Sequence, residues 1–316
     1  MCGITGIFDT RSGRPVVHAV LHRMNESQLH RGPDEGSLHI EPGVGLGHRR
    51  LSIIDVATGQ QPLFNEDGSV VVIFNGEIYN YQEIIPELQA LGHVFRTKSD
   101  TEVIVHAWEA WGAKCVDRFR GMFAFALWDR NQQTFFLARD RLGVKPMYYA
   151  VLDDGTLLFG SELKSLLAHG GLKREIDPYA VEEYFALGYV PEPRTIFKQA
   201  KKLPPAHTLV IRRGQPIPEP QPYWDVRFTL DNAITEAEAQ EELIRRLDES
   251  VRLRMIAEVP LAPSCRAAWT PAPWWRRWRA RAAGPSTPAP SPSTTRPSTK
   301  PNLPRWWPTA TTPTTS

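Results

Sequence analysis

The chain begins Met1-Cys2-Gly3-Ile4-Thr5-Gly6-Ile7-Phe8, a cysteine followed at once by a short run typical of a β-strand. Removal of Met1, which the small residue behind it favours, would leave Cys2 with a thiol and a free α-amino group. A thiol has a pKa of about 8.5 and an α-amino group about 7.7–8.0, so the amine can take the thiol proton near neutral pH. We therefore expect Cys2 to be a nucleophile that carries its own base.

Composition describes an ordinary globular chain. Of its 316 residues, 41% are hydrophobic and 23% charged, which allows two domains. The three cysteines, Cys2, Cys115 and Cys265, are far apart, so we expect neither a disulfide framework nor a metal site. We expect no membrane span, and because no basic-then-apolar leader precedes Cys2, we expect a cytoplasmic protein.

The net charge of the chain is +2, but the charged residues are unevenly distributed along it. Eight of the 37 Lys and Arg residues follow Leu261, whereas no Asp or Glu lies beyond Glu258. The first 261 residues therefore carry 37 − 8 = 29 basic against 35 acidic side chains. This mildly acidic body argues against nucleic acid as the natural partner.

From residue 3 to about 213, short apolar strands alternate with turns and a few helices. This pattern predicts an α+β sandwich, two packed sheets with helices outside. Asn75-Gly76-Glu77 is expected to close a buried strand, and Asp100 to cap a helix. The expected strands are 3–8, 44–55, 70–74, 122–128 and 134–138, and the expected helices are 16–28, 81–91 and 101–111.

The remainder divides into three stretches. A Pro-rich run at 215–222 marks a linker, so we place a first domain at 1–213 and the linker at 214–234. Residues 235–261 begin a second domain with a helix at 235–258, capped by Thr235 and Glu238, and then a strand at 259–261. Residues 262–316 contain no Val, Ile, Phe, Tyr, Asp or Glu, but six of the ten Trp and twelve of the 28 Pro, so we expect a disordered tail. In the expected helix at 235–258, the apolar face that should point inward consists of Ala239, Leu243, Leu247 and Val251.

Seven stretches stand out over about two-thirds of the chain. They are Met1-Cys2-Gly3-Ile4, His30-Arg31-Gly32-Pro33-Asp34, His48-Arg49-Arg50-Leu51-Ser52-Ile53, Phe74-Asn75-Gly76-Glu77-Ile78-Tyr79-Asn80, Lys98-Ser99-Asp100-Thr101-Glu102, Gly121-Met122-Phe123-Ala124-Phe125 and Arg139-Asp140-Arg141-Leu142-Gly143-Val144-Lys145-Pro146. In this order they resemble the class II glutamine amidotransferase domain, most closely that of the glutamine-hydrolysing asparagine synthetases. The resemblance implies a four-layer αββα sandwich of the N-terminal nucleophile hydrolase type.

The resemblance also implies roles for single residues. The Cys2 thiolate would attack the side-chain amide of glutamine, with the Asn75 side chain and the Gly76 N–H as the oxyanion hole. Arg50 would clamp the α-carboxylate, and Glu77 and Asp100 would hold the α-ammonium. The implied glutamine-binding residues are Arg50, Leu51, Ser52, Ile53, Ile54, Asn75, Gly76, Glu77 and Asp100, with no metal and no cofactor for this half-reaction.

Other nucleophile–base pairs are less favoured. His30, His48 and His93 could suggest a Cys–His dyad, but a terminal amine makes a histidine base unnecessary. Cys115 stands on the apolar face of an expected helix and is interpreted as a core residue.

The resemblance breaks after Val259-Pro260-Leu261, where the family has an ATP-binding loop, Ser-Gly-Gly-x-Asp-Ser. Residues 262–276 can be encoded by a set of synonymous codons which, after insertion of one guanine nucleotide (g) in front, is translated in a shifted frame. The shifted frame encodes Gly-Ala-Phe-Leu-Ser-Gly-Gly-Val-Asp-Ser-Ser-Ala-Val-Val-Ala. We therefore expect a frameshifted tail, and the alternative is a Trp/Pro-rich binding tail. ATP, Mg²⁺ and aspartate would be needed only by the intact enzyme.

The acceptor and the oligomeric state, a homodimer included, stay open. The alternatives are an asparagine-synthetase-like amidotransferase for another acceptor, such as a sugar in polysaccharide biosynthesis, another class II amidotransferase of the phosphoribosylpyrophosphate or glucosamine-phosphate type, and a non-catalytic remnant.

Overall fold

A computed structural model describes residues 2–229 and 233–259 of the chain. The predictions for Met1, for the strand at 259–261 beyond its first residue, and for the tail at 262–316 lie outside the described residues. Within the described part, no helix is both long and apolar enough to cross a membrane.

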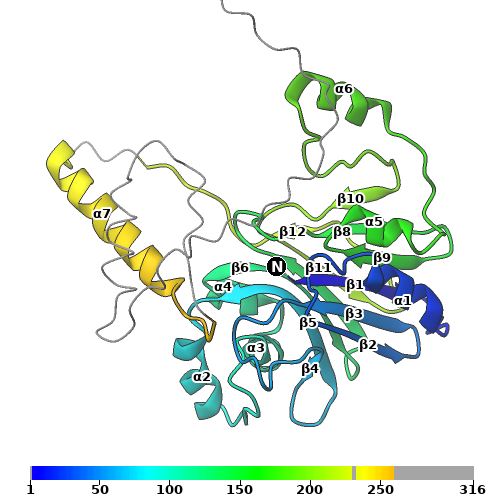
Figure 1. Cartoon of the computed structure of the whole chain (residues 1–316), viewed down its shortest axis with the longest axis horizontal. Coiled ribbons are helices and arrows are strands. Elements are labelled where there is room, and N and C mark those ends of the chain that lie inside the picture. Colours follow the sequence, from blue (N-terminus) through cyan, green and yellow to red (C-terminus); the bar gives the residue numbers. More distant parts are fainter. Residues whose placement is uncertain (1, 230–232, 260–316) are drawn as a thin grey trace, which may run out of the picture. The chain divides into compact units, whose positions relative to one another are not determined.

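Two six-stranded antiparallel sheets form the centre of the fold (Figure 1). The first sheet has the order β10 (Ala200–Lys202), β8 (Tyr148–Val151), β9 (Thr156–Gly160), β1 (Gly3–Asp9), β3 (Val44–Arg50) and β2 (Glu35–Glu41). The second has the order β12 (Gln221–Pro222), β11 (His207–Arg212), β7 (Thr134–Arg139), β6 (Gly121–Asp129), β5 (Val70–Ile78) and β4 (Leu63–Phe64). The helices are α1 (His18–Glu26), α2 (Tyr81–Ala90), α3 (Glu102–Trp111), α4 (Cys115–Arg118), α5 (Leu163–Leu167), α6 (Pro178–Leu187) and α7 (Glu236–Leu253), with a 3₁₀ turn at Gly112–Lys114.

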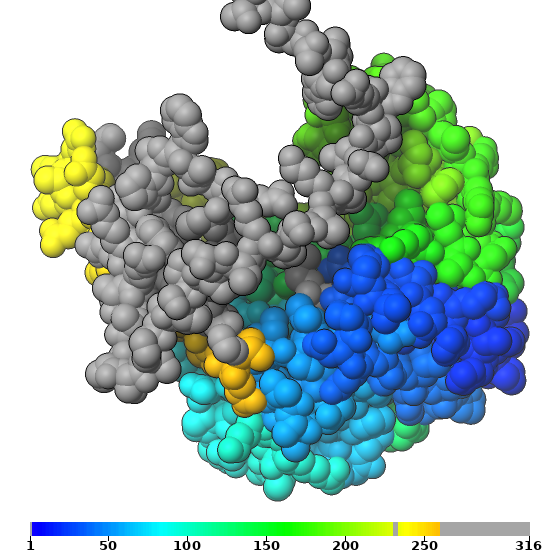
Figure 2. Space-filling view, viewed as in Figure 1, coloured from blue at the N-terminus to red at the C-terminus, as the bar shows by residue number. Residues whose placement is uncertain are grey.

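Three apolar clusters show how these elements are layered. Between the sheets, Phe8 of β1 packs with Trp128 and Phe135 of β6 and β7. The outer face of the first sheet packs on α1 and α5, and that of the second on α2, α3 and α4. The described residues thus form an α+β sandwich with layers in the order α, β, β, α, as expected. Figure 2 shows blue N-terminal residues adjoining green residues much later in the sequence, and α1 indeed contacts α5.

Two strands end at positions other than those predicted. β3 stops at Arg50 instead of reaching residue 55, because the next residues fold back so that the Arg50 guanidinium can donate to the carbonyls of Ile54 (3.2 Å) and Asp55 (2.6 Å). β5 continues through Asn75, Gly76 and Glu77 to Ile78, since its whole length pairs with β6. Asn75 and Gly76 therefore lie within a strand and do not form its closing turn.

Asp100 is not the cap of α3, contrary to prediction. Thr101 occupies the N-cap position, and no side chain caps this helix end. The Asp100 carboxylate instead accepts a hydrogen bond from the Ile78 amide at 2.9 Å. Its position just before the helix therefore serves to join α3 to the end of β5.

The predicted C-terminal helix is present but shorter than expected. α7 ends at Leu253, and its N-terminus has the predicted capping box between Thr235 and Glu238. Leu243 and Leu247 of its apolar face are exposed. In the predicted linker, Gln221–Pro222 forms β12 beside β11. The boundary at 213 remains a prediction.

Candidate active site

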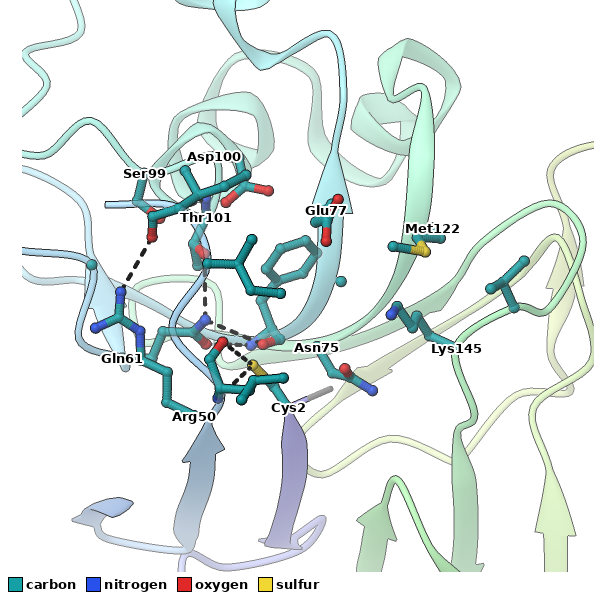
Figure 3. A pocket seen from close by; sticks show the side chains of 17 residues that line it. Cys2, Arg50, Gln61, Asn75, Glu77, Ser99, Asp100, Thr101, Met122 and Lys145 are labelled. Carbon is teal, nitrogen blue, oxygen red and sulfur yellow. Dashed lines mark hydrogen bonds between the residues drawn. The ribbon is translucent and has the colours of Figure 1, made fainter. Parts of the chain in front are cut away.

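A cavity of about 280 Å³ opens where the ends of β1, β3 and β5 meet the start of α3 (Figure 3). Its volume suits a small ligand the size of an amino acid. Every predicted site residue except Ser52 lines it. The lining residues are Cys2, Arg50, Leu51, Ile53, Ile54, Gly59, Gln61, Phe74, Asn75, Gly76, Glu77, Ser99, Asp100, Thr101, Met122, Val144 and Lys145.

Cys2 immediately precedes β1, so the first strand of the sandwich holds the thiol at the cavity wall. Its Sγ lies 3.4 Å from the Leu51 amide nitrogen, which donates to it, and 3.7 Å from the Leu51 carbonyl oxygen. Burial raises the pKa of the Cys2 thiol, while the Leu51 N–H and the positive charges of Lys145 and Arg50 oppose that rise. The same groups would stabilise a thiolate at this position.

Asn75 is fully buried in β5, and neither its amide nitrogen nor its amide oxygen has a hydrogen-bond partner among the described residues. A buried amide without partners is costly, by about 1–3 kcal/mol, and is uncommon unless a ligand supplies the missing bond. Because Asn75 lines the same cavity as Cys2, its Nδ2 is available to a developing negative charge near the thiol.

Gly76 is required by the neighbouring strand. A Cβ at this position would overlap the carbonyl oxygen of Met122 and lie 2.7 Å from the Cα of Phe123, both in β6. Gly76 also lines the cavity, where a residue without a Cβ allows a ligand to approach the backbone closely. The structure adds a second reason, which is the tight pairing of β5 with β6.

Arg50 is almost fully buried at the end of β3. Its Nη1 pairs with Glu35 at 3.3 Å, and its Nη2 donates to the carbonyls of Ile54 and Asp55. Arg50 therefore shapes the loop at 51–56 as well as lining the cavity. Ser52 in that loop does not line the cavity, and its backbone N–H donates to Asp34 at 2.9 Å.

Besides Arg50, two carboxylates and one lysine give the cavity its charge. Burial raises the pKa of Asp100 to about 7, and the neighbouring negative charge of Glu77 adds to that rise, although the Ile78 N–H opposes it. Burial also raises the pKa of Glu77, against the positive charges of Lys145 and Arg254. A cation placed beside Glu77 and Asp100 would relieve both effects, as the α-ammonium of an amino acid would.

Sequence reasoning missed several lining residues, of which Lys145 and Gln61 have a clear physical role. Lys145 is 4% exposed, and its ammonium has no hydrogen-bond or ion-pair partner among the described residues. Lys145 belongs to the stretch at 139–146 that resembles the family, so the sequence did contain an indication of its role. Gln61 pairs with the Phe74 backbone in both directions, at 2.6 and 3.2 Å, and so extends the sheet beyond β4. Nothing in its local sequence indicated this.

No histidine in the described residues lines the cavity. His48 is buried and bonds to the Phe74 carbonyl at 3.1 Å, and burial lowers its pKa to about 3. His30 pairs with Glu162, and His93 with Glu66. Cys115 is fully buried among apolar side chains, as expected, and burial raises its pKa.

The sequence matches the family model described as "Glutamine amidotransferase domain" over residues 1–224. It is 41% identical over 216 residues to "Asparagine synthetase [glutamine-hydrolyzing] 3" of Bacillus subtilis (strain 168), covering 67% of this chain and 35% of that one. It is 35% identical over 282 residues to "Putative asparagine synthetase [glutamine-hydrolyzing] 2" of Methanocaldococcus jannaschii, covering 83% of this chain and 53% of the other. A further relative, "Amidase chyE" of Penicillium rubens, is 37% identical over 74% of this chain and 34% of its own length.

Among solved structures, glutamine phosphoribosylpyrophosphate amidotransferase of B. subtilis, in complex with ADP and GMP, is similar at 20% identity and a TM-score of 0.48 over 67% of this chain and 47% of that one. The chain spans about a third to a half of the length of the curated relatives named above. The family match covers more than half of the chain, and the relatives at about 40% identity are named glutamine-hydrolysing asparagine synthetases and match in their N-terminal part. The chain therefore belongs to the glutamine amidotransferase family and contains its class II domain.

Proposed function

We propose that this chain hydrolyses glutamine through Cys2, once Met1 is removed, and that its sandwich is of the N-terminal nucleophile hydrolase type. The observation that carries the proposal is the meeting of a thiol, an unpartnered buried amide, the buried carboxylate of Asp100 and the half-buried carboxylate of Glu77 at one cavity. Residues 2, 75 and 100 are distant in sequence and come together only through β1, β5 and α3.

The proposed reaction proceeds through a covalent intermediate. The Cys2 sulfur attacks the side-chain carbonyl carbon of glutamine, and the Asn75 Nδ2 and Gly76 N–H donate to the resulting oxyanion. Collapse of the tetrahedral intermediate breaks the C–N bond and releases ammonia, with the proton supplied by the α-amine of Cys2. Water then hydrolyses the γ-glutamyl thioester to glutamate. Each oxyanion donor is worth roughly 3–4 kcal/mol of barrier where such donors have been removed in other enzymes.

Substrate orientation follows from charge. The α-ammonium would lie against Glu77 and Asp100, because burial raises the pKa of both carboxyl groups and a cation beside them would stabilise their charged forms. The α-carboxylate would lie toward Arg50, whose guanidinium is the arginine side chain drawn at the cavity in Figure 3. Because the Nη atoms of Arg50 already bond to Glu35 and loop carbonyls, this contact requires either the Nε–H or a shift of the loop.

The test is ammonia release from glutamine by the wild type and by Cys2→Ala, with intact-mass measurement of the N-terminus. We expect loss of Met1, activity only in the wild type, and γ-glutamyl hydroxamate when hydroxylamine is present to trap the thioester. Cys115→Ala serves as the matched control, because it removes a cysteine that lies outside the cavity. An active Cys2→Ala variant would refute the mechanism, and a folded but inactive wild type would favour a non-catalytic remnant.

We propose further that the intact protein is a glutamine-dependent asparagine synthetase and that this chain is out of frame from about residue 262. The proposal is supported by the recoded stretch 262–276, which restores a Ser-Gly-Gly-x-Asp-Ser loop directly after Val259-Pro260-Leu261. Residues that would hold ATP and Mg²⁺ are not among those described. The alternative is an asparagine-synthetase-like enzyme with another acceptor. It is supported by the relative whose name is that of an amidase and not of an asparagine synthetase.

The experiment compares the chain as written with a gene in which one g precedes codon 262. Only the repaired chain should form AMP and asparagine from ATP, aspartate and glutamine, while both release ammonia. Asparagine made by the unrepaired chain would refute the frameshift proposal. ATP binding without use of aspartate would assign a different acceptor.

A further inference from the structure

Four side chains with metal-binding atoms meet outside the Cys2 cavity. They come from the turn between β4 and β5, from the segment after α2, and from α3, which lie together on one side of the second sheet (Figure 1). None of the four lines the Cys2 cavity. The His/Glu cluster consists of Glu66, His93, His106 and Glu109, and one ligand atom from each lies within 4.8 Å of all the others.

Several distances within the cluster are close to those between ligands that share one metal ion. His106 Nδ1 lies 3.3 Å from Glu66 Oε2 and 3.6 Å from Glu109 Oε2, and His93 Nδ1 lies 3.3 Å from Glu66 Oε1 and 3.7 Å from Glu109 Oε2. Four ligands at about 2.0–2.2 Å from a Zn²⁺ ion stand about 3.3–3.6 Å apart in a regular tetrahedron. Glu66 faces each histidine with a different oxygen, and one atom from each residue lies within 4.8 Å of the others, so binding one ion would draw the four ligand atoms slightly closer together.

His106 supplies a second and independent observation. Its side chain is fully buried, and neither ring nitrogen makes a hydrogen bond to any described residue. A buried polar atom without a partner carries a penalty of about 1–3 kcal/mol. Its Nδ1 is directed into the cluster, where coordination would satisfy it.

The other nitrogen of His106 has the setting common for metal ligands. Nε2 lies 3.6 Å from Glu102 Oε1, and the Glu102 side chain is itself fixed by the backbone amides of Arg96 and Thr97 at 2.8 and 2.7 Å. A carboxylate behind a histidine orients the ring and raises its basicity toward a metal. Asn65 likewise donates to Glu109 Oε1 at 2.7 Å, which leaves Oε2 directed at the histidines.

Charge also favours a cation. Glu66, Glu102 and Glu109 form ion pairs only with His93 and His106, and no Lys or Arg of the described residues pairs with any of the three. If both histidines are neutral, three carboxylates stand around a partly buried space without a compensating cation. A divalent ion would offset most of that charge.

We propose that the His/Glu cluster binds one divalent transition-metal ion, with Zn²⁺ as the ion that fits best. Two imidazoles and two carboxylates in tetrahedral spacing are a ligand set that Zn²⁺ accepts, whereas Mg²⁺ and Ca²⁺ prefer oxygen ligands alone. The sequence analysis predicted no metal site at these residues. The ion would connect α3 to the turn before β5 and to the segment after α2. α3 directly follows Asp100 and Thr101, which line the Cys2 cavity. Its role is structural.

The test uses the full chain without a histidine tag, stripped with a chelator and then titrated with ZnCl₂ by calorimetry and measured for metal content. We expect one Zn²⁺ per chain and a rise in Tm on binding. Glu109→Gln and His93→Gln, both at partly exposed positions, should weaken Zn²⁺ binding at least tenfold and remove the rise in Tm while leaving the circular dichroism spectrum unchanged. His22→Gln is the matched control, a histidine on α1 that pairs with Glu26 outside the cluster.

The readouts separate a metal site from a hydrogen-bonded His/Glu network. Co²⁺ in place of Zn²⁺ should give the intense visible absorption of tetrahedral cobalt in the wild type and in His22→Gln, and no such absorption in His93→Gln. Zn²⁺ binding that is equally tight in wild type and Glu109→Gln, or lost equally in His22→Gln, would overturn the proposal. So would a wild type that holds no Zn²⁺ after gel filtration.

Discussion

Replacing Asp100 by Asn should stabilise the fold at neutral pH while impairing the proposed glutamine site. The carboxylate is 4% exposed and its pKa is raised to about 7 from an ordinary 3.8, first by burial and then by Glu77. Asparagine removes the charge, and its Oδ1 can still accept the hydrogen bond from the Ile78 N–H. The substitution therefore isolates the effect of the charge.

The expected size follows from linkage between protonation and folding. Because the folded pKa of Asp100 exceeds the unfolded value, the folded state binds more protons, so its stability falls as pH rises from about 3.8 to about 7. That interval is about three pH units at roughly 1.4 kcal/mol each, or about 4 kcal/mol as an upper limit. Asp100→Asn should thus match the wild type below pH 4 and exceed it increasingly up to pH 7.

Urea unfolding of both proteins at pH 5, 6, 7 and 8 measures this difference. The free energy of unfolding of Asp100→Asn minus that of the wild type should grow by roughly 1.4 kcal/mol per pH unit between pH 5 and 7 and then level off. Asp117→Asn, at an exposed aspartate on α4, should show no such growth. The KM for glutamine should rise at least tenfold in Asp100→Asn only.

A constant difference across this pH range, or a variant less stable than wild type at pH 7, would refute the assignment of a raised Asp100 pKa. An unchanged KM would remove Asp100 from the substrate site, whatever the stability result.

Three further substitutions test single contacts at the cavity. Arg50→Lys keeps the charge but loses the planar guanidinium, so KM for glutamine should rise at least tenfold. Amide hydrogen exchange should also become faster in the loop at 51–56, because the bonds to the Ile54 and Asp55 carbonyls are lost. An unchanged KM would exclude Arg50 from substrate binding, and unchanged exchange would exclude it from holding the loop. Lys145→Met removes a cation that opposes the raised pKa of Cys2, so the acid limb of kcat/KM against pH should move to higher pH, whereas exposed Lys164→Met should leave it in place. Gly76→Ala forces a Cβ against β6 and should lower the free energy of unfolding by about 2 kcal/mol or more, and a variant with wild-type Tm would contradict the tight pairing.

Features with local causes were predictable from the sequence. The capping box of α7 needs only Thr235 and Glu238, three residues apart, and it forms as predicted. The strands around the turn at 129–134 were predictable because an apolar run, a polar turn and a second apolar run define a hairpin, and Asp129 indeed pairs with Thr134. Cys2, Arg50, Asn75 and Asp100 were identified through resemblance in their flanking residues, and the structure places all four at one cavity.

The errors arose where a distant contact overrides a local preference. Asp100 has the sequence position of a helix cap, but Ile78, 22 residues earlier, supplies its hydrogen-bond donor. Arg50 ends β3 because its side chain bonds back to the carbonyls that follow it, which no periodicity reveals.

The sequence by itself therefore predicted the two-sheet sandwich and the candidate nucleophile Cys2, because alternation, capping and motif are local properties. Only the tertiary structure decided which charges face one another. Lys145 reaches the cavity of Cys2 although 143 positions separate them. Glu66 meets His106 because β5 and α3 pack together. Of the four residues 66, 93, 106 and 109, only the last two are close in sequence, one helical turn apart, so no short metal-binding motif indicates the cluster. Such pairings depend on chain packing, which brings side chains together independently of their distance in sequence.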